Sequence, residues 1–168
     1  MIRGLSIIMM LSANPTQAAD YYFCWTGSNN YTMTGQMTVP DAALSKPIVT
    51  ADDVTRFKIA GYRDGKLLGK WDMAARGPDD TWVLNFDPAT NSFLPGDTPL
   101  LGYSQGWNAN GDTDNCGPGG FGFNSGGYAQ DFCVNNVWIE ESGIDPPTPF
   151  LVSPTPVDPF CRIIAPLS

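Results

Sequence analysis

Histidine is absent from all 168 residues of the chain. This absence removes Ser-His-Asp and Cys-His nucleophile systems, histidine general bases, and the usual histidine-containing zinc and copper sites. Paired carboxylates remain available for glycosidase chemistry at Asp79-Asp80 and Glu140-Glu141. Adjacent residues on a strand point to opposite faces, so neither pair can supply both acids of one site. The composition therefore predicts a protein that is not an enzyme.

Basic residues are scarce as well. The chain has 9 Lys and Arg against 17 Asp and Glu, which gives a net charge of −8. A surface this negative repels phosphate backbones, and no basic run or patch offsets it. The charge balance excludes nucleic acid as a partner.

Long apolar runs are confined to the amino terminus. Residues 1–18 carry one positive charge at Arg3, then an apolar run over residues 5–11, then small residues up to Ala18. This order is typical of a secretory signal peptide, and the run is too short to span a bilayer. The alternative is an N-terminal strand or helix of the fold. Without the leader, 8 bases face 17 acids, a net charge of −9.

Residues 19–168 are long enough for one domain with a core, and no segment among them matches the length of a transmembrane helix. We expect a protein exported to the periplasm or released from the cell. The chain also has four cysteines, an even number that favours two disulfides in an oxidising compartment. The predicted pairs are Cys116 with Cys133, closing a glycine-rich loop, and Cys24 with Cys161, joining the chain ends.

Other cysteine arrangements stay open at this point. Four cysteines allow three connectivities, and buried free thiols are a further alternative. A zinc site is disfavoured, because the cysteines are 92, 17 and 28 residues apart and structural zinc prefers close pairs.

Alternating apolar and polar residues predict strands along most of the chain. Residues 21–25 and 31–39 read as an antiparallel pair with a break at residues 27–30. Asp64-Gly65 lies between two strand-like runs and predicts a hairpin, because glycine supplies the positive φ that the turn needs. Residues 82–94 predict two short strands around a turn at residues 87–91.

The rest of the chain offers fewer regular signals. Residues 131–142 predict one strand with an irregularity at Asn135-Asn136. The proline-rich end from residue 145 permits only edge strands or extended segments. Thr50, followed by Asp52 and Asp53, predicts one short helical turn. Many short strands with turns between them predict a single antiparallel β-sandwich, jelly-roll-like, with one helical turn and a long glycine-rich loop.

Five tryptophans in an acidic, exported β-protein suggest carbohydrate binding, because flat aromatic faces stack on sugar rings. Four of them fall within strand-like runs and are expected in the core. Trp107 falls in a predicted loop, and with Tyr103 and Tyr128 it is the candidate sugar platform.

The same glycine-rich loop has oxygen-bearing side chains at alternating positions: Asn108, Asn110, Asp112 and Asp114. Calcium takes six to eight oxygen ligands, so these four residues are the candidate calcium site. An EF-hand is excluded, because its sixth and twelfth positions would be Thr113 and Gly119 instead of glycine and glutamate. The alternative is a turn region whose side chains bond their own backbone, tethered by Cys116.

Two stretches, "VTADDVTRFKIAGY" and "WVLNFDPATNSF", resemble a pattern in exported bacterial β-sandwich proteins of the PEP-CTERM-associated type. The resemblance covers about residues 20–95 and rests on structural motifs. The chain ends "FCRIIAPLS", without the proline-glutamate-proline signal, membrane segment or basic tail of that type. The resemblance implies a fold and a location, because such proteins are mostly of unassigned function.

These observations predict an exported, non-enzymatic β-sandwich that acts through protein contacts as an envelope, extracellular-matrix or assembly subunit. The chief alternative is a carbohydrate-binding module that uses Trp107 and the Asn/Asp loop, with calcium as a candidate ion. A catalytic protein comes third.

Overall fold

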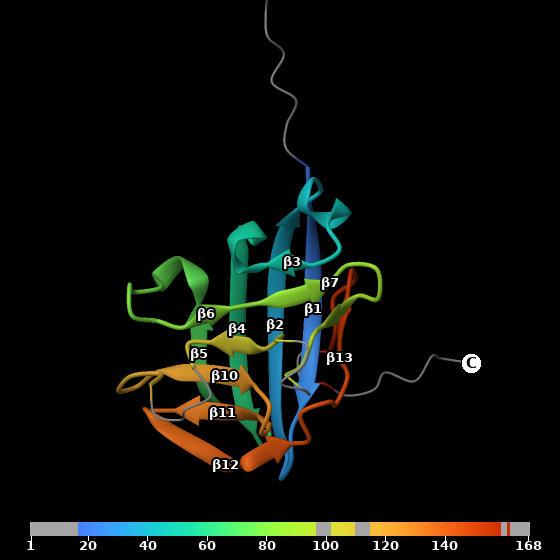
Figure 1. The fold of residues 1–168 in the computed structure, drawn as a ribbon. Coiled ribbons are helices and arrows are strands. Elements are labelled where there is room, and N and C mark those ends of the chain that lie inside the picture. Colours follow the sequence, from blue (N-terminus) through green and yellow to red (C-terminus); the bar gives the residue numbers. More distant parts are fainter. Residues whose placement is uncertain (1–16, 97–101, 110–114, 159–160, 162–168) are drawn as a thin grey trace, which may run out of the picture.

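A computed structural model describes residues 17–96, 102–109, 115–158 and 161. Nearly all regular structure in this part of the chain is β, arranged as two antiparallel sheets (Figure 1). The larger sheet has the order β3-β7-β8-β13-β1-β2-β4-β5 and the smaller has the order β12-β11-β10-β9-β6. The large sheet curls as a half-barrel, and the strands of the small sheet run across it.

The elements have the following bounds. The large sheet consists of β1 (Ala18–Thr26), β2 (Tyr31–Pro40), β3 (Val49–Thr50), β4 (Arg56–Arg63), β5 (Lys66–Asp72), β7 (Asn85–Asp87), β8 (Ser92–Phe93) and β13 (Phe150–Ser153). The small sheet consists of β6 (Trp82–Val83), β9 (Gln105–Trp107), β10 (Phe121–Ser125), β11 (Gln130–Val134) and β12 (Val137–Ile144). Three short 3-10 turns are η1 (Ala43–Ser45), η2 (Ala51–Asp53) and η3 (Met73–Ala75).

The prediction of a two-sheet, sandwich-like all-β fold is confirmed. The jelly-roll connectivity is not confirmed, since β9 to β12 follow one another in the small sheet as a meander.

β1 begins at Ala18, the last residue of the predicted signal peptide, and pairs there with Pro40. Gln17 is described as well, and its carbonyl accepts a hydrogen bond from the Asp41 backbone (3.0 Å), whereas residues 1–16 of that leader lie outside the described residues. No helix in the described ranges is long and apolar enough to cross a membrane.

Alternation along the central strands builds the core. Phe23, Met33 and Phe57 face inward from β1, β2 and β4 and are at most 1% exposed. Phe123 and Phe132 of the small sheet face them and are fully buried. Aromatic rings from both sheets make tilted and edge-to-face contacts throughout this interior, which is the arrangement that ring quadrupoles favour.

Glycine lets the two sheets approach closely at one point. The Phe121 ring of β10 occupies the space that a side chain at Gly61 of β4 would need. The Cβ atom of Phe121 likewise leaves no room for a side chain at Gly69 on β5. Any larger residue at these two positions would push the small sheet away from the large one.

Local turn chemistry is where the sequence was most informative. Asp64 and Gly65 have φ of 50° and 73° and join β4 to β5, which confirms the hairpin. The predicted helical turn is η2, where the Thr50 backbone N–H and hydroxyl both donate to the Asp53 carboxylate. The Lys46 ammonium pairs with the other oxygen of that carboxylate at 2.5 Å. Asp53 therefore has a structural role at a helix start.

Two strand predictions were wrong. Residues 131–142 are two strands, β11 and β12, because Asn135 and Asn136 both take positive φ (52° and 61°) and turn the chain. The proline-rich end provides β13, which lies between β8 and β1 and so is not an edge strand. Residues 150–153 contain no proline, so β13 can pair on both sides while prolines flank it.

Both predicted disulfides are present. Cys24 is bonded to Cys161 with a Cα–Cα distance of 5.3 Å, and Cys116 is bonded to Cys133 with a distance of 6.0 Å. The described residues include no free cysteine. Two disulfides are typical of a protein that folds in an oxidising compartment, as expected for export.

Candidate functional site

Trp107 is not a surface platform, and this prediction is corrected. Trp107 lies in β9, is 0% exposed, and its ring packs on Phe57 of the opposite sheet with a centroid distance of 4.7 Å. The sequence around it is rich in glycine and polar residues, which suggested a loop. The pairing of β9 with β6 and β10 turns its side chain inward instead.

The other two residues of the predicted platform are more exposed than Trp107. Tyr103 is half-buried in the segment before β9. Tyr128 is 78% exposed, and its ring lies beside Trp138 of β12 with a centroid distance of 6.1 Å. The three predicted residues therefore do not form one exposed aromatic surface.

Of the predicted calcium ligands, only Asn108 lies within the described residues. Asn108 is 6% exposed, and its amide nitrogen donates to the backbone carbonyls of Cys116 (3.2 Å) and Phe121 (3.0 Å). These bonds give Asn108 a structural role in holding the loop against β10. Asn110, Asp112 and Asp114 lie outside the described residues. Elsewhere in the described chain, no group of three or more Cys, Asp or Glu is placed to hold a metal.

One acid of each pair considered for glycosidase chemistry has structural partners. The Asp80 carboxylate accepts hydrogen bonds from the Trp71 indole (3.3 Å) and the Gly77 backbone (3.1 Å). Glu141 accepts from the Tyr31 hydroxyl (2.7 Å) and from Arg63 (2.6 Å). The hydrogen bond from Tyr31 and the Arg63 guanidinium hold the pKa of Glu141 below its usual range, against a smaller desolvation effect at this exposed side chain.

The small sheet holds a buried acid, Asp131. Asp131 of β11 is opposite Asn124 of β10, and both side chains are buried, at 6% and 8% exposure. Burial raises the pKa of Asp131 to about 6, against hydrogen bonds from Trp138 and Asn124 that lower it. Since an indole N–H can only donate, Trp138 is the donor to the Asp131 carboxylate.

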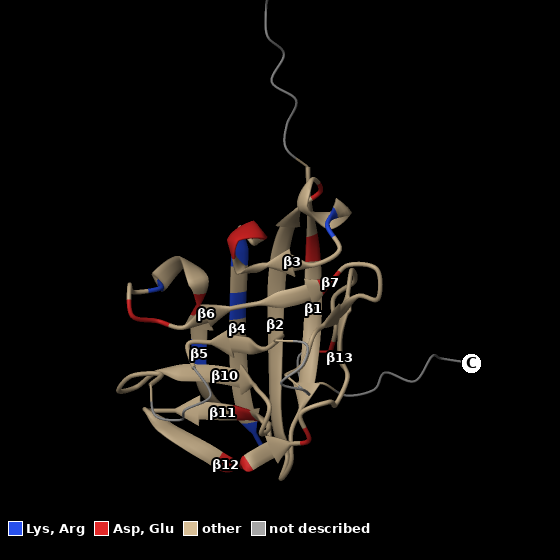
Figure 2. Cartoon of the chain, in the orientation of Figure 1, with Lys and Arg blue, Asp and Glu red and all other residues tan. Residues whose placement is uncertain are grey.

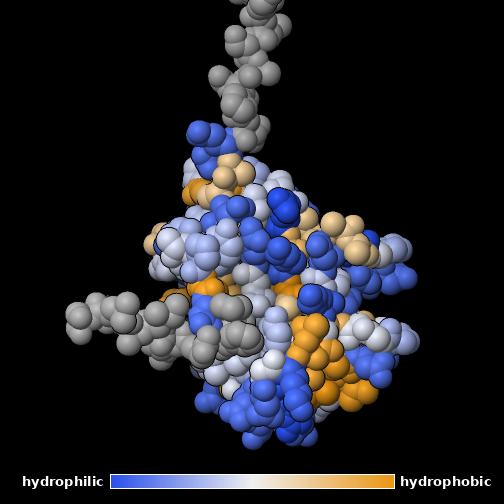
Figure 3. Space-filling model, turned by 180° about the vertical axis from the view of Figure 1, so that it is seen from behind, coloured by the Kyte–Doolittle hydropathy of each residue, from blue (hydrophilic) through white to orange (hydrophobic). Residues whose placement is uncertain are grey.

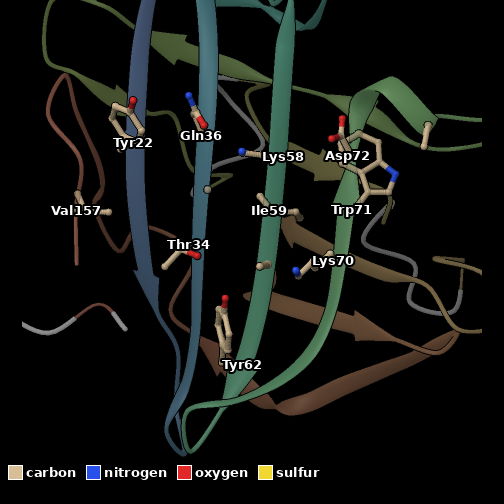
Figure 4. Close-up of a pocket in the computed structure, with 13 residues that line it drawn as sticks. Tyr22, Thr34, Gln36, Lys58, Ile59, Tyr62, Lys70, Trp71, Asp72 and Val157 are labelled. Carbon is tan, nitrogen blue, oxygen red and sulfur yellow. The ribbon is translucent and has the colours of Figure 1, made fainter. Parts of the chain in front are cut away.

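A hollow of the described surface lies on the outer face of the large sheet, opposite the core. It is an open groove of about 600 Å³ that crosses β1, β2, β4 and β5 (Figure 4). The strand register fixes its floor in two rows. One row reads Tyr22, Gln36, Lys58, Asp72 across the four strands, and the next reads Cys24, Thr34, Ala60, Lys70.

Side-chain size explains why the sheet is hollow here. Thr34 and Ala60 are short and lie in the middle of the second row, whereas longer side chains surround them. Tyr62 stands two residues beyond Ala60 on β4, and Tyr22 stands across the sheet on β1 (Figure 4). Both tyrosines are half-buried. The groove therefore has two tyrosine rings at separate corners of a floor that combines polar and apolar side chains.

The Cys24–Cys161 disulfide helps to shape the groove. Cys24 lies on the outer face of β1, and Val157 from the segment after β13 lines the groove on that side. The bond anchors that segment, by way of Cys161, to β1. The disulfide thus holds one wall of the groove in place.

Cations gather on the same hairpin. Five of the nine Lys and Arg residues of the chain lie on β4 and β5 (Figure 2). Lys58 and Lys70 line the groove and are exposed. Among the described residues that line it, the one carboxylate is that of Asp72, which accepts a hydrogen bond from the Ala74 backbone (2.9 Å).

The sequence contained a signal for this face that the predictions did not use. Thr34, Gln36, Lys58 and Lys70 are the polar partners in the alternation that identified the strands, so they had to face away from the core. Their assembly into one groove depends on the pairing of β2 with β4 and of β4 with β5, because residues 34 and 70 are far apart in the chain.

Comparisons of the chain with models of known protein families, with characterised proteins and with solved structures find no match. The resemblance to PEP-CTERM-associated proteins therefore stays a prediction.

Proposed function

We propose that the protein is an exported, non-enzymatic carbohydrate-binding module whose ligand lies in the groove on the outer face of the large sheet. The observation that supports this most directly is the lining of the groove. Tyr22 and Tyr62 offer ring faces to a sugar, and Thr34 and Gln36 offer a hydroxyl and an amide to its hydroxyl groups. This proposal keeps the ligand class predicted from the sequence and moves it away from Trp107.

The non-enzymatic part of the proposal rests on the acids. Glycoside hydrolysis uses two carboxyl groups on either side of the bond that breaks. Asp72 is the single carboxylate among the residues that line the groove, and it caps η3 through Ala74. A groove whose one lining carboxylate already accepts a backbone hydrogen bond supports glycan binding without cleavage of the glycan.

A substitution that fills the groove tests this function. Ala60→Phe places a ring on the groove floor, so binding of glycans on an array should be lost while the melting temperature stays close to that of the parent. Ala42→Phe makes the same change at an exposed turn outside the groove and should leave binding intact. Retained binding in Ala60→Phe, or equal loss in both variants, would reject the groove as the binding site.

A second candidate is the predicted envelope, matrix or assembly subunit that acts through protein contacts. Figure 3 shows a hydrophobic patch on the back of the molecule. Leu67 of β5 and Val137 of β12 are 51% and 54% exposed, which is high for large apolar side chains. β5 is also an edge strand of the large sheet. A large exposed apolar side chain on an edge strand, such as Leu67 on β5, favours contact with another protein.

Photo-crosslinking in the native envelope tests this second candidate. A photoreactive residue at position 67 should capture a protein partner. The same residue at Leu151 of β13, which is 65% exposed, is the control and should capture none. Equal capture at both positions, or none at position 67, would count against a protein contact at β5.

A further inference from the structure

Two lysines flank the hollow in the middle of the groove. Lys70 of β5 lies directly opposite Ala60, and Lys58 lies two residues before Ala60 on β4. Lys58 and Lys70 are therefore diagonal neighbours on one face, a relationship that places their Cα atoms roughly 7–8 Å apart. In Figure 4 the Lys58 side chain turns from β4 toward β2, and the Lys70 side chain turns from β5 toward β4. This spacing allows both ammonium groups to reach one anionic group held above Ala60.

Neither lysine is neutralised within the described part of the chain. The ion pairs there involve Lys46 and Arg63, and neither Lys58 nor Lys70 takes part in one. Asp72 is opposite Lys58 in the register, but it forms no ion pair with Lys58 and bonds to the Ala74 backbone. The groove is therefore cationic, although the chain as a whole carries a net charge of −8.

The positive charge continues along the groove. A smaller adjoining hollow, of about 180 Å³, shares Gln36, Lys58 and Asp72 with the groove and adds Arg56 to the lining. Arg56, Lys58 and Lys70 therefore follow one another along a continuous depression. At physiological salt, charges beyond about 8 Å are largely screened, so acids elsewhere on the protein weaken this local field little.

We propose that the ligand is an acidic polysaccharide whose sugar rings carry carboxylates, with one carboxylate bound between Lys58 and Lys70. This inference rests on the proposed carbohydrate-binding function. A neighbouring sugar ring lies against Tyr62 or Tyr22, and Thr34 and Gln36 meet its hydroxyl groups. A neutral glycan would leave both ammonium groups unpaired, whereas a carboxylate forms charge-assisted hydrogen bonds with them.

Calorimetry with a matched pair of ligands tests the charge requirement. Oligogalacturonate and its methyl ester have the same backbone and differ in the carboxylate charge. The disulfide-bonded protein should bind the acid at least about tenfold more tightly than the ester, which corresponds to the loss of one charge-assisted contact. Affinity for the acid should fall as salt rises.

Matched variants locate the contact. Lys58→Gln and Lys70→Gln should each weaken binding of the acid by about tenfold. Lys66→Gln removes the same charge from the same hairpin outside the groove lining and should change affinity little. Tyr62→Ala should weaken binding, while Tyr62→Phe keeps the ring and should preserve it. Lys58, Lys66 and Lys70 are all exposed, so these charge variants should fold like the parent.

The outcomes separate this inference from the broader function. Equal binding of acid and ester, lost together in Ala60→Phe, would overturn the acidic ligand and keep the carbohydrate-binding module. No binding of any glycan would overturn both proposals. An acidic peptide such as poly-glutamate binding more tightly than oligogalacturonate would overturn the assignment to a sugar. Equal weakening by Lys66→Gln would show that the effect is not local to the groove.

Discussion

Phe57 of the large sheet and Trp107 of the small sheet meet face to edge in the middle of the core, with ring centroids 4.7 Å apart and an interplanar angle of 62°. Trp107 also contacts Phe23, Phe93 and Phe123. This ring therefore joins the two sheets at their centre.

The first prediction concerns the stability that Trp107 provides. Trp107→Ala should lower the free energy of unfolding by about 3–5 kcal/mol, because it opens a cavity between the sheets. Trp107→Phe should cost less, since it keeps most of the ring volume. The Trp107 indole nitrogen has no hydrogen-bond partner among the described residues, so phenylalanine leaves no partner unsatisfied. Chemical denaturation of both variants measures the difference. A small loss of unfolding free energy in Trp107→Ala would contradict the central role of this ring.

The second prediction concerns the two disulfides. The Cys24–Cys161 bond spans 137 residues of sequence and the Cys116–Cys133 bond spans 17. Loop-closure entropy predicts that replacing both cysteines of the long loop with alanine costs about 2 kcal/mol more than the same change in the short loop. Guanidinium unfolding of the two double variants tests this. An equal cost would mean that native-state contacts, and not chain entropy, dominate.

The long-loop disulfide should also affect ligand binding. The Cys24→Ala/Cys161→Ala variant releases the segment that carries Val157, so the wall of the groove is no longer fixed. Affinity for a groove ligand should fall in this variant and stay unchanged in Cys116→Ala/Cys133→Ala. Calorimetry on folded protein, verified by circular dichroism, distinguishes the two.

The third prediction is a pH dependence from Asp131. Burial raises its pKa in the folded protein to about 6, from 3.8 in the unfolded chain. Between these values the folded state holds a proton that the unfolded state releases, so stability falls as pH rises. The contribution is fully present below pH 3.8 and is lost above about pH 6, an expected change on the order of 3 kcal/mol.

Asp131→Asn is the control for this effect, because it keeps a neutral group with similar shape in the same place. Unfolding in urea from pH 3.5 to 7.5 measures the free energy of both proteins. As pH rises, the parent should lose stability relative to the variant. Other acids contribute equally to both proteins. Parallel curves would contradict the raised pKa.

The fourth prediction separates two roles of Asn136. Its backbone has a φ of 61°, and its side-chain oxygen accepts a hydrogen bond from the Gly117 backbone at 3.0 Å. Asn136→Gly removes only the side-chain bond and should cost about 1 kcal/mol. Asn136→Ala loses the same bond and also places alanine, which tolerates the left-handed region less well than asparagine or glycine, at this φ, so it should cost about 1 kcal/mol more. Thermal or chemical unfolding checks the order, and equal losses would mean that the turn relaxes.

The sequence was sufficient for features that depend on neighbouring residues. Alternation identified the faces of β1, β2, β4 and β5, and Asp64-Gly65 fixed a hairpin because few residue pairs accept its φ values. Thr50 and Asp53 identified η2 for a similar reason, since a helix start needs local acceptors. The missed turn at Asn135-Asn136 was also local: asparagine tolerates positive φ, and that signal was read as an irregularity within one strand.

Tertiary structure decided what depends on which strands become neighbours. Trp107 has polar and glycine neighbours in the chain, yet it is buried because β9 pairs between β6 and β10. β13 joins the interior of the large sheet through contacts with residues more than 120 positions away in sequence. The groove brings together residues 22, 34, 58, 70 and 157, and no local pattern relates them. Alternation assigns each side chain to a face, but the partner strands, and so the site on that face, follow from how the whole core packs.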